Sequence, residues 1–191
     1  MSGESFLINS PLFIVNLMAE NSPGETNEGQ NPLTAPLVAL ANELKQTNSD
    51  WVNEIIDALG EVTIIVPRER IADACSFLKT QKQFDFLSDI CGADRGAEDD
   101  PRFEVNYHLF STKTYQRLRL KVLLSEDDPK VQTVTSVWRT ANWHERETFD
   151  MFGVVFDGHP DLRRILLPSD FDGHALRKDY PLRGFEPYSL S

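Results

Sequence analysis

Histidine and carboxylate side chains gather around residue 145 and are the first candidates for chemistry. His144, Glu145 and Glu147 are followed by His159 and His174, and all of these side-chain types can bind metals. The run 144–148 opens like the His-Glu-x-x-His helix of zinc proteases, but its last position is Thr. The Glu-x-x-His pattern of di-iron bundles is absent as well. A metal site is therefore not predicted, and a free-standing metalloenzyme is a remote alternative.

Catalysis by a general acid and a general base is the second chemistry open to this cluster. Glu145 or Glu147 could act with His159, but no predicted element forms a pocket around them, so this alternative stays open. Glycine-rich nucleotide motifs and a Gly-x-Ser-x-Gly motif are absent. Cys75 and Cys91 lack iron–sulfur spacing, and Cys75 is expected to be a buried thiol. No catalytic, cofactor-binding or metal-binding residue is predicted.

The acidic residues of this cluster lie on a predicted helix, residues 138–152. At about 100° per residue, Glu145 falls in the middle of a largely aromatic face, and Glu147 and Asp150 fall on a second face that also carries aromatic and apolar residues. A carboxylate that is buried without a partner is costly or takes up a proton. Glu145 and Glu147 are therefore expected to meet cations.

Several basic residues could supply these cations. Arg146 lies four residues before Asp150, and pairing on the helix surface would contribute about 0.3 kcal/mol. Further cations follow downstream, namely Arg163, Arg164, Arg177 and Lys178. Arginine suits the task because its planar fork binds a carboxylate through two hydrogen bonds. Such pairs would pin the C-terminal segment to the domain, hold it on a partner, or do both.

The elements that must position these residues are predicted from hydrophobic periodicity. Apolar residues at helical spacing predict helices within 37–44, 52–59 and 71–78, and short apolar runs predict strands at 62–66 and 84–90. Strict alternation over 103–109 and 118–124, separated by six residues, predicts an antiparallel hairpin with one apolar face. Helices must cover that face, so the predicted fold class is α+β, a two-layer sandwich of helices on a mainly antiparallel sheet.

The chain divides into three predicted parts. Residues 1–35 are predicted to be a flexible N-terminal extension, 36–156 the α+β domain, and 157–191 an extended irregular tail. The apolar stretch 6–18 lacks a basic start and is broken by Pro and Asn, so a signal peptide is not predicted. A long irregular tail rich in Gly, Pro and charge is expected to need an external surface to order it, which predicts partner docking.

Composition excludes two classes of protein. The formal net charge of −11 argues against a nucleic-acid binder, since phosphate contact needs clustered Lys and Arg. No run of about 18 apolar residues exists, so no membrane-spanning helix is predicted.

The C-terminal third resembles the C subunit family of respiratory complex I, the NADH–quinone oxidoreductase. The resemblance rests on Ala141-Asn142-Trp143, the octet Glu145-Arg146-Glu147-Thr148-Phe149-Asp150-Met151-Phe152, His159, Arg163, Ile165-Leu166, Gly173-His174 and Leu176-Arg177-Lys178-Asp179-Tyr180-Pro181-Leu182. Position 175 is Ala where the family usually has Pro, which loosens the local backbone. The first 35 residues resemble nothing in the family.

The resemblance implies a non-catalytic subunit of the peripheral arm that supports electron transfer from NADH to quinone, coupled to proton translocation. FMN and the Fe-S clusters would reside in partner subunits, and the implied neighbours are subunits of the D, B and I types. The complex would lie at the cytoplasmic face of the bacterial inner membrane. The equivalent subunit of a membrane-bound hydrogenase or a ferredoxin-dependent complex is the alternative. The residues predicted to form structural or docking ion pairs are Glu145, Arg146, Glu147, Asp150, His159, Arg163, Arg164, His174, Arg177, Lys178 and Asp179.

Overall fold

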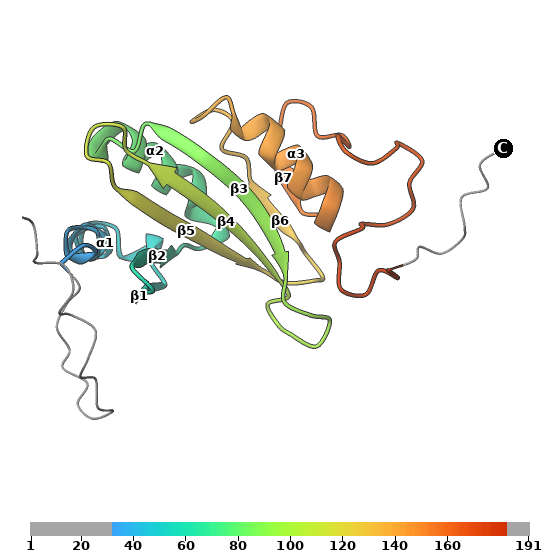
Figure 1. Cartoon of the computed structure of the whole chain (residues 1–191), viewed down its shortest axis with the longest axis horizontal. Helices are drawn as coiled ribbons and strands as arrows, with labels where there is room; N and C mark the ends of the chain where they lie inside the picture. The colour runs from blue at the N-terminus through green and yellow to red at the C-terminus, as the bar shows by residue number, and fades with distance from the viewer. Residues whose placement is uncertain (1–31, 183–191) are drawn as a thin grey trace, which may run out of the picture.

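A five-stranded sheet forms the centre of the molecule (Figure 1). The computed structural model describes residues 32–182. Its strand order is β1-β2-β5-β4-β3, and every neighbouring pair is antiparallel except β2 and β5, which run parallel. The strands are β1 (Glu54–Ala58), β2 (Glu61–Ile65), β3 (Phe86–Asp94), β4 (Phe103–Phe110) and β5 (Arg117–Leu124).

The predicted hairpin of β4 and β5 is confirmed. Phe103 pairs with Leu124 and Phe110 with Arg117, which leaves the six residues 111–116 as the connection. Every second residue of both strands is buried, so the two strands present one apolar face to the core and one polar face outward.

The helix predicted at 52–59 is wrong, because this segment contains strand β1. Apolar residues at 52, 55, 56 and 59 fit helical spacing, but most of them are β-branched and favour a strand. Leu59 and Gly60 then form a two-residue turn with positive φ angles, +55° and +79°, which joins β1 to β2 as a hairpin.

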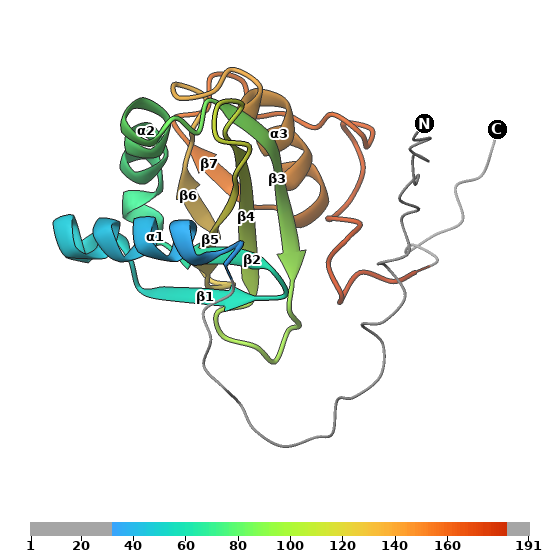
Figure 2. The same ribbon diagram turned by 60° about the vertical axis from the view of Figure 1, so that its left-hand side comes forward.

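Helices cover the apolar face of the sheet. Helix α1 (Ala35–Thr47) buries Leu37, Ala41 and Leu44, and helix α2 (Ile71–Lys82) buries Ile71, Ala74, Cys75 and Leu78, as the helical spacing predicts. Two short 3-10 turns, Ser49–Trp51 and Arg68–Arg70, precede β1 and α2. Figure 2 shows both helices on the same side of the sheet.

Helix α3 (Ala141–Phe152) packs along strand β3 at the edge of the sheet. Its Thr148 hydroxyl donates a hydrogen bond to the Ile90 carbonyl, and the Phe152 ring lies so close to Gly92 that a Cβ there would sit 2.5 Å from the ring. The helix begins at residue 141, slightly later than predicted, and ends at Gly153 with φ +77°. A small parallel pair, β6 (Lys130–Gln132) and β7 (Val155–Asp157), flanks it.

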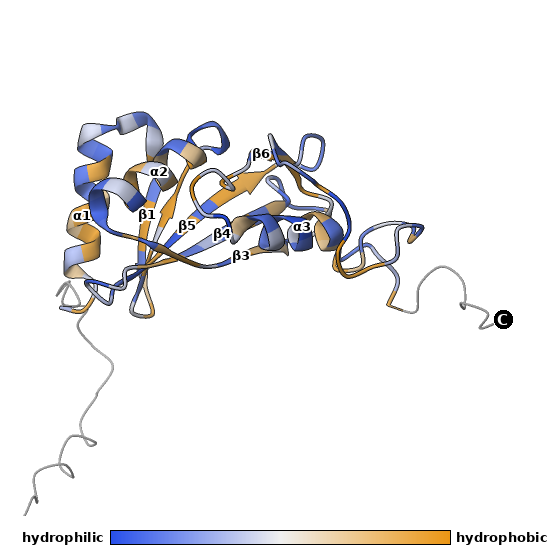
Figure 3. Cartoon of the chain, turned by 90° about the horizontal axis from the view of Figure 1, so that it is seen from above, coloured by the Kyte–Doolittle hydropathy of each residue, from blue (hydrophilic) through white to orange (hydrophobic). Residues whose placement is uncertain are grey.

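The predicted α+β two-layer fold with a mainly antiparallel sheet is confirmed by this architecture. The buried core joins residues of α1, α2, α3 and the sheet, and Figure 3 shows apolar stretches on the strands and on parts of the helices. Within residues 32–182, no helix is both long and apolar enough to cross a membrane. The predicted N-terminal extension, 1–35, lies almost entirely outside the described residues, as do residues 183–191 of the predicted tail.

Candidate interaction site

Asp150 on α3 is the main attachment point for the segment that follows β7. Its carboxylate is fully buried, and Oδ2 accepts hydrogen bonds from the backbone N–H groups of Ile165, Leu166 and Leu167 at 2.8–3.0 Å. Oδ1 accepts from Arg164 at 2.7 Å. Burial raises the pKa of Asp150, but these donors outweigh it, so the pKa lies below the ordinary value of a free aspartate.

Arg164 extends this attachment along the segment. One of its terminal nitrogens, Nη2, donates to the carbonyls of Phe171 and Gly173 at 3.0 and 2.9 Å. The guanidinium also lies over the Phe171 ring, whose other neighbour is the stacked ring of Tyr180. A single arginine thereby connects α3 to two later points of an irregular backbone.

Arg146 does not pair with Asp150, although the spacing of four residues predicts this. Its guanidinium is buried and donates to the backbone carbonyls of Arg163 and Arg164, and it stacks over the Trp143 ring at 5.2 Å. The segment runs back along α3 and supplies partners that a local helix rule does not consider.

The C-terminal end of α3 is capped by two residues of the same segment. Arg177 donates to the Phe152 carbonyl at 2.7 Å, and the ring Nδ1 of His174 donates to the Asp150 carbonyl at 3.0 Å. Both side chains pack against Gly153, where a Cβ would lie 2.6 Å from each of them. Burial lowers the pKa of His174.

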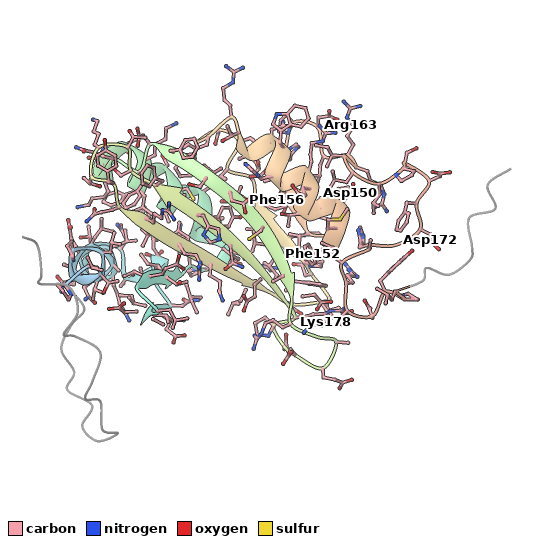
Figure 4. All side chains as sticks on the ribbon, in the orientation of Figure 1. Asp150, Phe152, Phe156, Arg163, Asp172 and Lys178 are labelled. Carbon is pink, nitrogen blue, oxygen red and sulfur yellow. The ribbon has the colours of Figure 1, made fainter. Side chains whose placement is uncertain are left out.

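A second attachment joins the segment to the far end of the sheet. The side chain of Arg102 is almost completely buried and forms ion pairs with Asp94 at 2.8 Å and Asp179 at 2.9 Å, as well as with Glu126. Asp94 also accepts from the backbone N–H of Lys178 at 2.7 Å. Hydrogen bonds from Arg102 hold the pKa values of Asp94 and Asp179 below their ordinary range. Figure 4 shows Asp150 on α3 and Lys178 near the lower tip of β3.

Glu145 is fully buried but has no arginine or lysine as a partner within residues 32–182. Its carboxylate accepts from the Val134 N–H at 2.7 Å and the Thr133 hydroxyl at 2.5 Å. Burial is the largest cause that raises its pKa, to about 7, and the two hydrogen bonds only partly oppose it. The expected cation is therefore replaced by a hydroxyl and a backbone amide.

His159 approaches Glu145 at 3.9 Å, but its hydrogen bonds are those of a neutral imidazole. Nδ1 accepts from the Asp161 N–H, so it carries no hydrogen, and Nε2 lies 3.2 Å from the Asn142 carbonyl, to which it must donate. The other titratable groups near Glu145 are Cys75 and Tyr107, both fully buried with pKa values that burial raises. None of these neighbours balances a negative charge on Glu145.

The opposite side of the site faces outward. Glu147 is exposed and forms no ion pair with residues 32–182, and Arg163 is exposed and pairs only with Asp161 at 2.9 Å among the same residues. Three apolar side chains are exposed as well: Trp143 at the start of α3 and Leu166 on the segment, each by 61%, and Leu176 near the end of α3, by 55%. The site thus has an inner side whose hydrogen bonds and ion pairs hold the segment in place, and an outer side that carries both charged and apolar side chains.

Sequence reasoning missed Asp94 and Arg102, because no local pattern marks an arginine in a loop as buried. It also expected an external surface to order the tail; attachments from the same chain hold residues 161–180, and docking of the tail to a partner stays a prediction. In the part of the chain that the structure describes, no group of three or more His, Cys, Asp or Glu side chains is placed to hold a metal ion.

Fold and site together define a class of protein: a two-layer α+β domain whose C-terminal segment is fixed along one helix by buried charges. A family model described as the respiratory-chain NADH dehydrogenase 30 Kd subunit matches residues 64–186, and the chain belongs to this family. The resemblance drawn from the C-terminal motifs is thereby confirmed.

Curated relatives and solved structures agree with this assignment. The NADH-quinone oxidoreductase C subunit 2 of Rhizobium meliloti (strain 1021) is 55% identical over 131 residues, which cover 68% of this chain and 71% of the relative. The C subunit of the Geobacter sulfurreducens enzyme is 45% identical over 148 residues, 76% of this chain and 91% of the relative. A structure titled as the trypsin-resistant fragment (1-134) of Nqo5 has a TM-score of 0.56 and 37% identity, covering 64% of this chain and 98% of the fragment.

The fold also occurs in a second respiratory complex. A chain of the archaeal membrane-bound sulfane sulfur reductase has a TM-score of 0.64 over 77% of this chain and 86% of that chain, at 20% identity. At that identity the likeness concerns the fold alone.

Proposed function

We propose that this chain is a structural and assembly subunit of the peripheral arm of an NADH–quinone oxidoreductase. In this role it supports electron transfer from NADH, through FMN and Fe-S clusters held by partner subunits, to quinone, coupled to proton translocation. The chain itself supplies no catalytic residue and binds no cofactor. Its neighbours are subunits of the D, B and I types, and the complex lies at the cytoplasmic face of the inner membrane.

The observation that carries this proposal is the division of roles within the site. The charges of Asp150, Arg164, Arg177 and Asp179 are bound to groups of the same chain, so they hold the segment in one conformation. A fixed conformation lowers the entropy lost on binding. The apolar side chains left outside the attachments are then available to a partner.

The outer side of the site has the composition of a protein–protein contact. Trp143 is held by the stacked guanidinium of Arg146, and Leu166 is one of the residues whose backbone Asp150 binds. Aromatic and arginine side chains carry most of the binding energy in protein interfaces. We therefore place the partner contact at Trp143, Leu166 and Leu176, with Arg163 and Glu147 at its rim.

The alternative is an equivalent subunit of a related hydrogenase or ferredoxin-dependent complex. The fold does not discriminate, because the sulfane sulfur reductase chain shares it. Identities of 55% and 45% to C subunits of NADH-quinone oxidoreductases favour the first proposal.

Co-purification from solubilised membranes tests the proposal. A tagged wild-type chain should retain an NADH-oxidising assembly, and the double variant Trp143→Ser/Leu166→Ser should retain about tenfold less, as expected when a contact centre is lost. Tyr115→Asn is the matched control, since Tyr115 is 80% exposed on the β4–β5 connection, away from the site.

Two results would contradict different parts of the proposal. If the double variant recovers as much assembly as the wild type, the α3 surface is not the partner contact. If the wild-type chain co-purifies with no oxidoreductase subunit, the chain has no assembly role.

A further inference from the structure

The hydroxyl of Tyr107 is buried in the core without a hydrogen-bond partner. Tyr107 lies in the middle of β4 and points, like the other alternate residues of this strand, to the apolar face of the sheet. Its side chain is fully buried, and its Oη atom meets no donor or acceptor within residues 32–182. Its neighbours on the adjacent strands, Ile90 and Leu120, have only apolar side chains. A phenylalanine would fill the same space at less cost, because a buried hydroxyl has given up its hydrogen bonds to solvent.

Two further polar groups lie near this hydroxyl, one on α2 and one on α3. They are the Cys75 thiol and the Glu145 carboxyl, and both side chains are fully buried. Burial is the largest cause that raises the pKa of Tyr107, and Cys75 and Glu145 raise it further. Glu145 also raises the pKa of Cys75, after burial. The three side chains therefore form one buried polar cluster, and no direct hydrogen bond joins Tyr107 to the other two.

The carboxyl group of Glu145 can accept a further hydrogen bond. Two carboxylate oxygens offer about four lone-pair sites. The structure uses one at Oε1, for the Val134 N–H, and one at Oε2, for the Thr133 hydroxyl. The hydrogen on Nε2 of His159 is directed to the Asn142 carbonyl instead. Glu145 is therefore able to accept from a small molecule that also accepts from Tyr107.

We propose that one internal water molecule lies between Tyr107 and Glu145, accepts the hydrogen of the tyrosine hydroxyl and donates to the carboxyl group. The Cys75 thiol, which is a weak donor, is its third neighbour. Buried waters usually bond to two to four polar groups that have no other partner, and globular proteins hold about one per 27 residues. The water thereby connects the central strand β4 to α3, the helix that holds the C-terminal segment. This site lies in the core and does not depend on the proposed assembly role.

Tyr107→Phe tests the proposal, because a hydrated hydroxyl and an unsatisfied one shift stability in opposite directions. With the water in place, the variant loses a hydrogen-bonded bridge, and the midpoint temperature of the purified chain should fall by about 2–4 °C. A hydroxyl without any partner would instead be better removed, and the midpoint temperature would rise. Tyr115→Phe is the matched control, since Tyr115 is 80% exposed and its hydroxyl should not affect stability.

A direct bond between Tyr107 and the Cys75 thiol is the competing explanation for a lower midpoint temperature. Cys75→Ala separates the two, because it removes the thiol and leaves Glu145 in place. The loss caused by Tyr107→Phe should be the same in the wild-type and Cys75→Ala backgrounds if the water bridges to Glu145. It should disappear in the Cys75→Ala background if the thiol is the partner of Tyr107, and this result would overturn the proposal.

A high-resolution crystal structure of the wild-type chain tests the water directly. The proposal expects density for an ordered water about 2.6–3.0 Å from both the Tyr107 Oη atom and a Glu145 carboxyl oxygen. The proposal is overturned if no water lies there, or if Tyr107 and Glu145 bond to each other directly. A higher midpoint temperature of Tyr107→Phe would also overturn it.

Discussion

Replacing Glu145 by Gln should stabilise the protein at alkaline pH and leave it nearly unchanged at acid pH. Glu145 is fully buried, and its pKa is raised from 4.5 to about 7. Each pKa unit corresponds to about 1.4 kcal/mol, so ionising this carboxyl in the folded state costs about 3 kcal/mol more than in the unfolded chain. Gln can keep both contacts, since its carbonyl accepts from Val134 and its amide donates to the Thr133 hydroxyl.

The wild type loses stability as the pH rises because the pKa of Glu145 is higher in the folded protein than in the unfolded chain. The stabilising contribution of the protonated Glu145 is complete below about pH 4.5 and is lost as the pH rises through about 7. The wild-type free energy of unfolding should therefore fall relative to the Gln variant between about pH 5 and pH 8, by about 2–3 kcal/mol.

Urea denaturation of both proteins at several values between about pH 5 and pH 8 measures this difference. Glu147→Gln is the control, because Glu147 is exposed on the same helix and its replacement should give no pH-dependent difference. The prediction is refuted if the difference in free energy of unfolding between the wild type and Glu145→Gln stays constant over this range. Such a result would mean that folding does not raise the pKa of Glu145.

Two further perturbations probe the attachment of the C-terminal segment. Gly153→Ala should destabilise the protein by about 2 kcal/mol, because φ is +77° and the new Cβ would lie 2.6 Å from His174, whereas Gly60→Ala, with φ +79° and open space, should cost about 1 kcal/mol. Thermal unfolding of both variants checks this, and equal losses would contradict the steric argument. Arg102→Met should cost about 3–5 kcal/mol, because it leaves buried Asp94 without its cation, and should speed proteolysis near Asp179. Unchanged urea midpoints and cleavage rates would show that the ion pairs of Arg102 do not hold the C-terminal segment to the sheet.

Sequence patterns predicted the fold wherever burial alternates over a long stretch. The alternation over 103–124 defines both strands and their connection, and the helical spacing of 71–78 defines α2. The error at 52–59 arose because the four apolar residues have helical spacing, although three of them are β-branched and favour a strand. The usual turn signal was also hidden, since Leu59 stands where Asn or Gly would mark a hairpin.

The site was predicted as a set of residues but not as a set of pairs. The sequence placed Glu145, Glu147 and Asp150 among aromatic residues; Glu145 and Asp150 are buried, whereas Glu147 is exposed and meets no cation within residues 32–182. The individual pairs could not be predicted from the sequence, because the partners lie far apart along the chain. Asp150 pairs with Arg164, 14 positions later, and Arg102 pairs with Asp179, beyond β7. Such pairs depend on the path of an irregular segment, which no periodicity describes.

The way in which the C-terminal segment is fastened also bears on the order of folding. Lys178 bonds to Asp94 across 84 residues of sequence, and Arg164 and Arg177 bond to groups of α3, Asp150 and the Phe152 carbonyl, which are brought into place only when the helix has formed. If these long loops closed before the sheet and α3 had formed, the segment would make few stabilising contacts. Those contacts would not offset the conformational entropy that the chain loses on closing the loops. We therefore expect the segment to join last, so that weakening it speeds unfolding while hardly slowing folding. Until the segment attaches, the polar groups of α3 that it binds are exposed to water. A newly synthesised chain would therefore lack the complete surface that a partner binds.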